Sequence, residues 1–182
     1  MARLAPSDAA AFDSMARIWR RWRAPHLGLA DAWRAVGFAP RSPVPRNTLG
    51  TLLFDLGRVS EAREQFVRAL ELDGGAIYAL RNLCAALQVD PKEAPAGAAC
   101  RQAVTLAEQV AAQPPAGAAA DPATARIETR AADLVRIGID HLAHRRQTEA
   151  TAALREAAEL LSPDVPATPV DSGRLPARHD DD

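Results

Sequence analysis

The side chains best suited to chemistry in this chain are two histidines. His141 and His144 stand three residues apart in a stretch predicted to be helical, a spacing that can place two metal ligands on one helix face. No third ligand lies nearby, so we favour His141 as a core residue with a polar tip and expect no metal and no cofactor. The phosphate-binding glycine loop and the motifs of serine hydrolases and zinc proteases are also absent from the sequence. We therefore predict that the protein is not an enzyme.

The elements that position the remaining side chains are predicted to be helices. Hydrophobic residues make up 48% of the 182 residues but aromatic ones only 4%, so the apolar content is largely Ala, Leu and Val. Such a composition favours an all-α fold. No apolar run is long enough to span a bilayer, and the N-terminus lacks a secretory signal or a lipobox. From the chain as written we expect a cytoplasmic location and no membrane span.

Charge is unevenly distributed along the chain. Residues 1–46 have a net charge of +5, residues 47–112 of -2 and residues 113–182 of -4. Because the total is close to neutral, nucleic-acid binding is not favoured. A basic beginning and an acidic end instead favour a polar protein partner or contacts within the chain.

An internal repeat with a period of about 34 residues organises the sequence. Two apolar stripes between residues 49 and 70 follow helical spacing and flank the turn at Gly57, which predicts an antiparallel helix pair. One period after Gly50 stands Cys84, and one period after Phe66 stands Cys100. Positions that carry a large side chain in one copy of the repeat also carry a large one in the next, and small side chains likewise recur at equivalent positions. The small positions are expected to lie where the two helices of a pair touch.

This pattern resembles the tetratricopeptide repeat, because Leu49-Gly50, Ala62 and Phe66 match the motif L-G, then A-x3-F, and the period is the same. The resemblance implies an α-solenoid of stacked antiparallel helix hairpins, a TPR-like superhelix. It divides the chain into an N-terminal degenerate repeat or cap at 1–42, two repeats at 43–110, a loop or helix extension at 111–130, a further repeat at 131–162 and a disordered tail at 163–182. The structural repeat positions are Leu49, Gly50, Leu53, Ala62, Phe66, Ala69, Leu83, Ala96, Ala103, Gly138, Ala150 and Ala157.

Two features of the repeats leave alternatives open. Cys84 and Cys100 fall at facing positions of the second repeat; we favour two buried thiols, with a disulfide as the alternative in an oxidising compartment. In the N-terminal unit, Met15, Trp19 and Trp22 share one helical face with Phe12, and we predict that this face is core. The run around these tryptophans is also basic, which leaves an anionic membrane or RNA as a less favoured reading.

The resemblance implies a concave groove, lined by the first helix of each hairpin, that receives a peptide or helix of a partner. Carrying that face over by phase gives Arg17, Arg20, Arg21, Asn47, Thr51, Phe54, Asp55, Arg81, Ala85, Gln88, Val135, Ile139 and Leu142. This groove would be basic at one end and apolar at the other. It suits a protein segment with acidic residues followed by apolar anchors, with no small-molecule substrate.

The function that we expect is a scaffold or adaptor for protein binding. The repeat sequences resemble those of bacterial proteins, and they are similar to repeat proteins that assist assembly of tight-adherence (Flp-type) pili. A secretion chaperone of the type III translocator kind and a regulatory subunit of a separate enzyme are the alternatives. The identity of the partner and the oligomeric state do not follow from the sequence.

Overall fold

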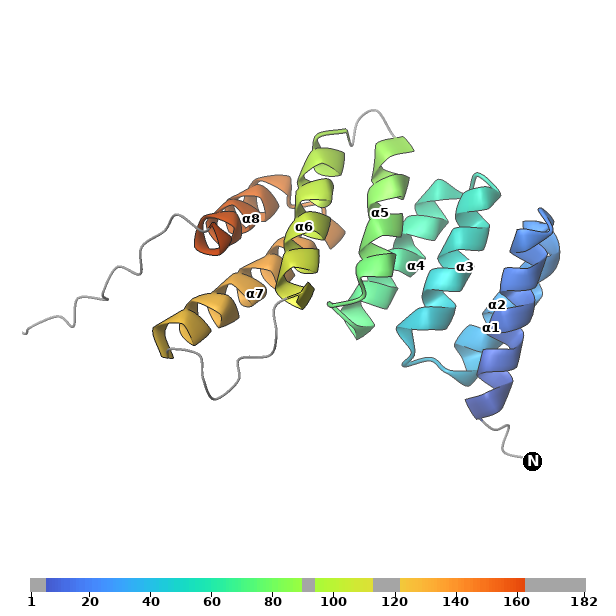
Figure 1. The fold of residues 1–182 in the computed structure, drawn as a ribbon. Helices are drawn as coiled ribbons and strands as arrows, with labels where there is room; N and C mark the ends of the chain where they lie inside the picture. The colour runs from blue at the N-terminus through green and yellow to red at the C-terminus, as the bar shows by residue number, and fades with distance from the viewer. Residues whose placement is uncertain (1–5, 90–93, 113–121, 163–182) are drawn as a thin grey trace, which may run out of the picture.

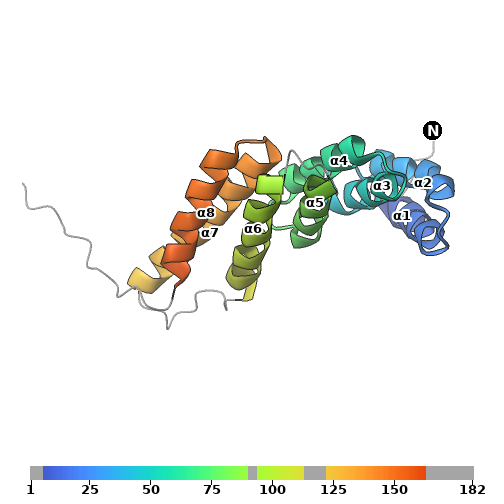
Figure 2. The same ribbon diagram turned by 90° about the horizontal axis from the view of Figure 1, so that it is seen from above.

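The computed structural model describes residues 6–89, 94–112 and 122–162, and every regular element in these ranges is a helix. The expected tail at 163–182 and residues 113–121 of the expected extension lie outside the described residues. The helices are α1 (Pro6–Arg21), α2 (Pro25–Phe38), α3 (Pro43–Asp55), α4 (Val59–Leu72), α5 (Ile77–Val89), α6 (Ala94–Ala112), α7 (Pro122–Ala143) and α8 (Gln147–Leu161). They follow one another in a row from α1 at one end to α8 at the other (Figures 1 and 2). The prediction of an all-α protein is confirmed.

Proline marks the beginning of several helices. Pro25 and Pro43 stand in the first turn of α2 and α3, and α1 and α7 also begin at a proline. Proline is favoured at this position because its fixed φ suits a helix and the first amide has no partner within the helix. The start of α7 at Pro122 lies nine residues before the repeat boundary expected at 131. Part of the expected extension therefore belongs to α7.

Three helix pairs are joined by turns of the same geometry. Arg23, Gly57 and Arg145 have φ values of 58°, 74° and 60°, in the left-handed region. In the turn after α3, the N–H of Arg58 donates to the carbonyl of Leu53 over 2.9 Å, and the other two turns contain the equivalent bond. This is the Schellman arrangement, which ends a helix and reverses the chain. It brings α2 back along α1, α4 along α3 and α8 along α7.

Replacing Gly57 by Ala is expected to lower the free energy of unfolding by about 1 kcal/mol, because a Cβ is disfavoured at positive φ. No atom lies within 4 Å of the Cβ position, so the cost comes from the backbone alone. Gly37→Ala is the matched control: its Cβ also meets nothing within 4 Å, but Gly37 lies within α2, where Ala is the better helix former. Chemical denaturation should show opposite signs for the two variants.

Small residues allow the paired helices to approach closely. A Cβ at Gly50 would lie 2.5 Å from the ring of Phe66, and one at Gly138 would lie 2.7 Å from the side chain of Leu154. In α5 and α6 the equivalent positions are Cys84 and Cys100, which form a disulfide with a Cα–Cα distance of 5.5 Å. All three pairs have the same separation of 16 residues in the chain. The expected close contact between the helices of a pair is thus present in each.

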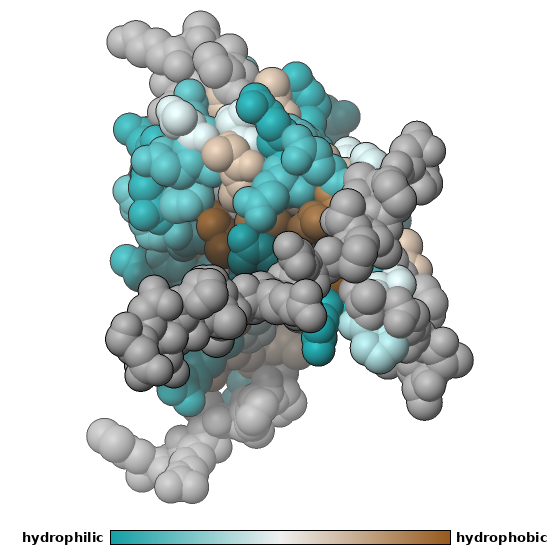
Figure 3. Space-filling view, turned by 90° about the vertical axis from the view of Figure 1, so that its left-hand side faces the viewer, coloured by the Kyte–Doolittle hydropathy of each residue, from teal (hydrophilic) through white to brown (hydrophobic). Residues whose placement is uncertain are grey.

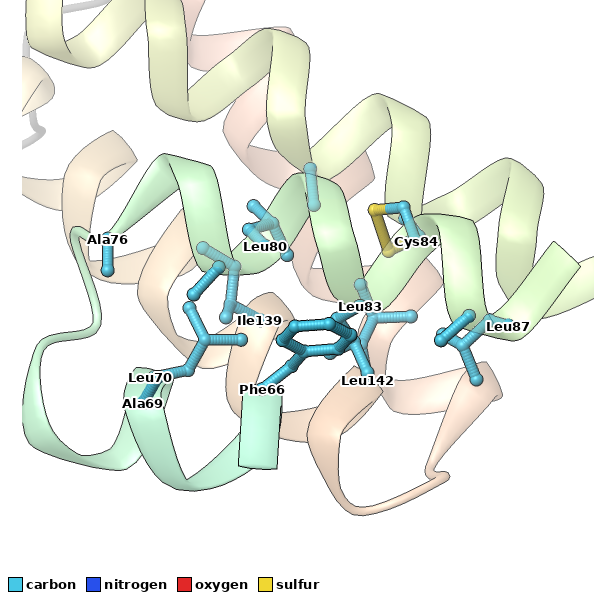
Figure 4. Close-up of a cluster of buried hydrophobic side chains, with 14 of the residues drawn as sticks. Phe66, Ala69, Leu70, Ala76, Leu80, Leu83, Cys84, Leu87, Ile139 and Leu142 are labelled. Atoms are coloured by element: carbon cyan, nitrogen blue, oxygen red, sulfur yellow. A yellow bond between two sulfur atoms is a disulfide. The ribbon is translucent and has the colours of Figure 1, made fainter. Parts of the chain in front are cut away.

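The repeat positions expected in the core are all buried. Apart from the two glycines, they belong to one hydrophobic cluster that runs from α1 to α8 and is centred on leucines of α3 and α5. Phe66 is 1% exposed and lies beside Leu83 in this cluster (Figure 4). The end of the molecule formed by α7 and α8 has a largely hydrophilic surface with a smaller hydrophobic area (Figure 3). The described chain therefore forms a helical, repeat-like architecture around one continuous core.

Ala62 lies in this core on α4 and is completely buried. We expect Ala62→Leu to overpack the contact between α3 and α4 and to destabilise the protein by about 1–3 kcal/mol. A lower melting temperature in circular dichroism would follow. An unchanged melting temperature would mean that the helices of this pair do not meet at Ala62.

The tryptophan face of α1 corrects one expectation. Trp22 is 66% exposed and Met15 is 46% exposed, so they are not core residues. The buried face of α1 instead carries Ala9 and Ala16. A Cβ at Gly28 of α2 would lie 3.0 Å from the carbonyl oxygen of Ala16. The other two residues of the tryptophan face, Phe12 and Trp19, are half-buried against α2: Phe12 stacks on Phe38, and the Cβ of Trp19 would lie 3.1 Å from a Cβ at Gly28.

Candidate functional site

A cavity of about 1080 Å³ opens between α1, α3 and α5. These helices present successive polar side chains to it because a helix repeats the same face every three or four residues. The cavity is lined by Arg17, Arg20, Arg21, Arg23, Pro25, Val44, Asn47, Thr48, Thr51, Asp55, Tyr78 and Asn82. We call it the basic cleft.

Two of the four arginines in the basic cleft are held by neighbouring groups. Arg17 forms an ion pair with Asp13 at 2.9 Å and donates from Nε to Thr48 Oγ1 over 3.4 Å. Arg20 pairs with Asp55 of α3, with 2.6 Å between Nε and Oδ2. These contacts tie α1 to α3. They fix the wall of the cleft and neutralise part of its charge.

The other two arginines keep their charge available. Arg21 is the last residue of α1 and Arg23 lies in the turn that follows. Both residues are exposed. Neither has an ion-pair partner within the described part of the chain. The C-terminal end of a helix also attracts cations to this position. The basic cleft therefore carries two positive charges that can pair with a ligand's carboxylates.

Part of the cleft wall is polar but uncharged. Asn82 of α5 donates from Nδ2 to Asn47 Oδ1 of α3 over 2.7 Å. This bond leaves the amide nitrogen of Asn47 and the carbonyl oxygen of Asn82 for other partners. One donor and one acceptor side by side match the hydrogen-bonding groups of a peptide backbone.

Tyr78 adds a hydroxyl group from α5. Tyr78 is 40% exposed. Burial, supported by the charge of Asp73, raises the pKa of Tyr78 above its usual value, while the nearby Arg17 acts in the opposite direction. The phenol therefore remains protonated at neutral pH and can donate a hydrogen bond to an acceptor in the cleft.

The structure brings together about half of the groove residues predicted from the sequence. Those that line the basic cleft are Arg17, Arg20, Arg21, Asn47, Thr51 and Asp55. On α5, Arg81, Ala85 and Gln88 are exposed but do not line it; Arg81 pairs with Glu108 of α6. Phe54 is partly buried and packs against the core.

The prediction that residues of α7 form an apolar end of the groove is wrong. Val135, Ile139 and Leu142 of α7 are 4%, 5% and 3% exposed and belong to the hydrophobic core. Ile139 and Leu142 lie in the cluster that contains Phe66 (Figure 4). Since α7 packs against α6 and turns this face inward, none of the three is accessible to a partner.

Sequence reasoning missed several residues of the cleft, although the repeat period contained a signal for them. Tyr78 stands one period after Val44, and Asn82 stands one period after Thr48. All four line the cleft. They lie on the first helix of a pair, three residues before the positions that we selected. The missed residues thus lie one helical turn before the predicted ones, on about the same side of each helix.

The histidines and cysteines give no sign of reactive chemistry. His144 lies 3.3 Å from Asp140 and is exposed, while His141 is half-buried with an Nδ1 that has no hydrogen-bond partner among the described residues. Within residues 6–89, 94–112 and 122–162, no group of His, Cys, Asp and Glu is arranged to hold a metal ion. The expectation of two free thiols is wrong, because Cys84 and Cys100 are paired.

At this level the structure defines an all-helical, repeat-like protein with an arginine-lined cleft. Comparison of the chain with protein-family models, curated proteins and solved structures finds no match. Among the helices described, none is both long enough and apolar enough to cross a membrane.

Proposed function

We propose that the protein is a non-enzymatic interaction module of the tetratricopeptide-repeat type, an α-solenoid that binds an acidic segment of a partner protein in the basic cleft. The repeat assignment is supported by the equivalent contacts at Gly50 and Phe66, at Cys84 and Cys100, and at Gly138 and Leu154. Helix pairs that share such contacts bury their apolar faces against their neighbours.

The observation that carries the proposal is that two arginines without ion-pair partners, Arg21 and Arg23, line the same cleft as the bonded amides of Asn47 and Asn82. Arginines pair with carboxylates, and the two amides fit an extended backbone. A partner with two or more acidic residues in an extended stretch satisfies both groups at once. Because the charges are exposed, binding should weaken as salt concentration rises.

Affinity purification with mass spectrometry tests this function. The wild type is compared with an Arg21→Ser, Arg23→Ser double variant, which removes the two unpaired charges and leaves the ion pairs of Arg17 and Arg20 intact. A partner captured by the wild type should be lost by the variant. The charge-matched control is Arg126→Ser with Arg155→Ser, two exposed arginines on α7 and α8. Loss of the partner in both variants alike would contradict binding in the cleft.

The disulfide bears on where the protein acts. Disulfides persist in oxidising compartments and are rare in the cytosol. We therefore propose an oxidising compartment instead of the cytoplasm expected from the sequence, and the Cys84–Cys100 disulfide supports this proposal. A role in pilus or secretion-system assembly at the cell envelope is compatible with this location.

A further inference from the structure

An apolar stripe runs along the outer side of α1. Met15, Ile18 and Trp22 follow one another at intervals of three and four residues, so they share one face of the helix. They are 46%, 45% and 66% exposed. None of them lines the basic cleft, to which Arg17, Arg20 and Arg21 contribute from the adjoining side of the same helix.

The position of α1 leaves this stripe uncovered. Helices α1 and α2 form the end of the row opposite to α8 (Figures 1 and 2). The buried side of α1, which includes Ala9 and Ala16, packs on α2 and α3. No described helix lies over the stripe. Three large apolar side chains are thus exposed together on α1 and on the residue that directly follows it.

The charges next to Trp22, at the C-terminal end of the stripe, are positive, whereas Asp8 lies two turns before Met15 at the other end of α1. Arg21 and Arg23 adjoin Trp22 in the chain and have no ion-pair partner among the described residues. The carboxylates of Asp13 and Asp31 in the same helix pair are buried and matched by Arg17 and Arg34. A surface with Trp, Ile and Met beside unpaired Arg is suited to the interface of an anionic bilayer, where indole rings enter the headgroup region and guanidinium groups pair with phosphates.

We propose that α1 docks the protein on the surface of an anionic lipid bilayer, with Ile18 and Trp22 inserted among the headgroups and Arg21 and Arg23 against lipid phosphates. This role goes beyond the proposed binding of a protein partner. Association of two copies through the stripe is disfavoured, because the arginines of both copies would approach one another. A single exposed helix face also offers no groove for a peptide.

Co-sedimentation with lipid vesicles tests the proposal. The full chain is mixed with vesicles of phosphatidylcholine alone or with phosphatidylglycerol added, at low salt. The wild type should sediment with the anionic vesicles and much less with the neutral ones. An Ile18→Ser, Trp22→Ser variant should lose about tenfold or more in partitioning. Failure of the wild type to bind anionic vesicles, or equal binding of the variant, would overturn the proposal.

Two controls separate docking from folding and from self-association. Trp33→Ser removes another exposed tryptophan, 51% exposed on α2, and should leave vesicle binding unchanged. Both residues of the test variant are about half exposed or more, so its melting temperature should match that of the wild type. If ultracentrifugation showed a wild-type dimer that the Ile18→Ser, Trp22→Ser variant abolishes, the stripe would be an interface between copies and the membrane proposal would be wrong. The test variant keeps every residue of the basic cleft, so it should still capture the protein partner while it loses vesicle binding.

Discussion

Phe66→Ala is expected to lower the free energy of unfolding by about 3–5 kcal/mol, because it removes a ring that is 1% exposed at the centre of the core. The ring fills the space left by Gly50 and contacts the leucine cluster of α3 and α5. Phe66→Leu should cost less, since Leu154 occupies the equivalent position against Gly138. Chemical denaturation of the three proteins measures the difference.

A double-mutant cycle isolates the contact between Phe66 and Gly50. In the wild type, Gly50→Ala would place a Cβ 2.5 Å from the ring and should destabilise by about 1–3 kcal/mol. In the Phe66→Ala background the space is free, so the same change should be neutral or should stabilise by up to about 1 kcal/mol through helix propensity. Equal effects of Gly50→Ala in both backgrounds would show that the two residues are not in contact.

Reduction of the Cys84–Cys100 disulfide is expected to lower the free energy of unfolding by about 3 kcal/mol, the value for closing a loop of about 15 residues in the unfolded chain. The melting temperature should fall when dithiothreitol is added. A Cys84→Ala, Cys100→Ala variant should melt below the oxidised wild type and should not respond to dithiothreitol.

Thiol titration of the unfolded protein tests directly whether the two cysteines are paired. Protein purified without reductant should show no free thiol, because both cysteines are paired. Two free thiols in protein isolated from its own cell would contradict the disulfide and with it the proposed oxidising compartment.

The helix pairs were predictable because their contacts recur at a fixed interval. Gly50 and Phe66 are small and large at positions whose equivalents one period later are Cys84 and Cys100. A helix pair needs complementary volumes wherever its axes approach closely, so the period of the sequence follows the period of the packing. The same argument correctly placed Ala62 in the core.

The environment of α7 could not be predicted from that period. An insertion separates this helix from the preceding pair, and α7 extends over 22 residues whereas α5 has 13. The position of these residues within the repeat therefore did not reveal that Val135 and Ile139 turn toward α6 and the core. Side-chain size was also a poor guide in α1, where Ala16 lies in the close contact with Gly28 and Trp22 is exposed.

The positive charge of the candidate site could be predicted from the sequence, but not which of its arginines form ion pairs. Arg17, Arg20 and Arg21 stood out as a basic run, yet the sequence did not show that Asp13 and Asp55 pair with two of them. Those ion pairs join residues on different helices or at buried positions, so they depend on how α1 lies on α3. The distinction between structural and free arginines came from the structure.

Photocrosslinking in the cell of origin tests the central claim most directly. A photoreactive residue is placed at Thr51, which lines the basic cleft, and in a control protein at Thr151 on α8, which has the same half-buried environment outside it. Thr51 should crosslink to partner segments rich in Asp and Glu, and these crosslinks should be lost in the Arg21→Ser, Arg23→Ser background. Crosslinks to segments without acidic residues, or equal crosslinking from Thr51 and Thr151, would contradict the central claim.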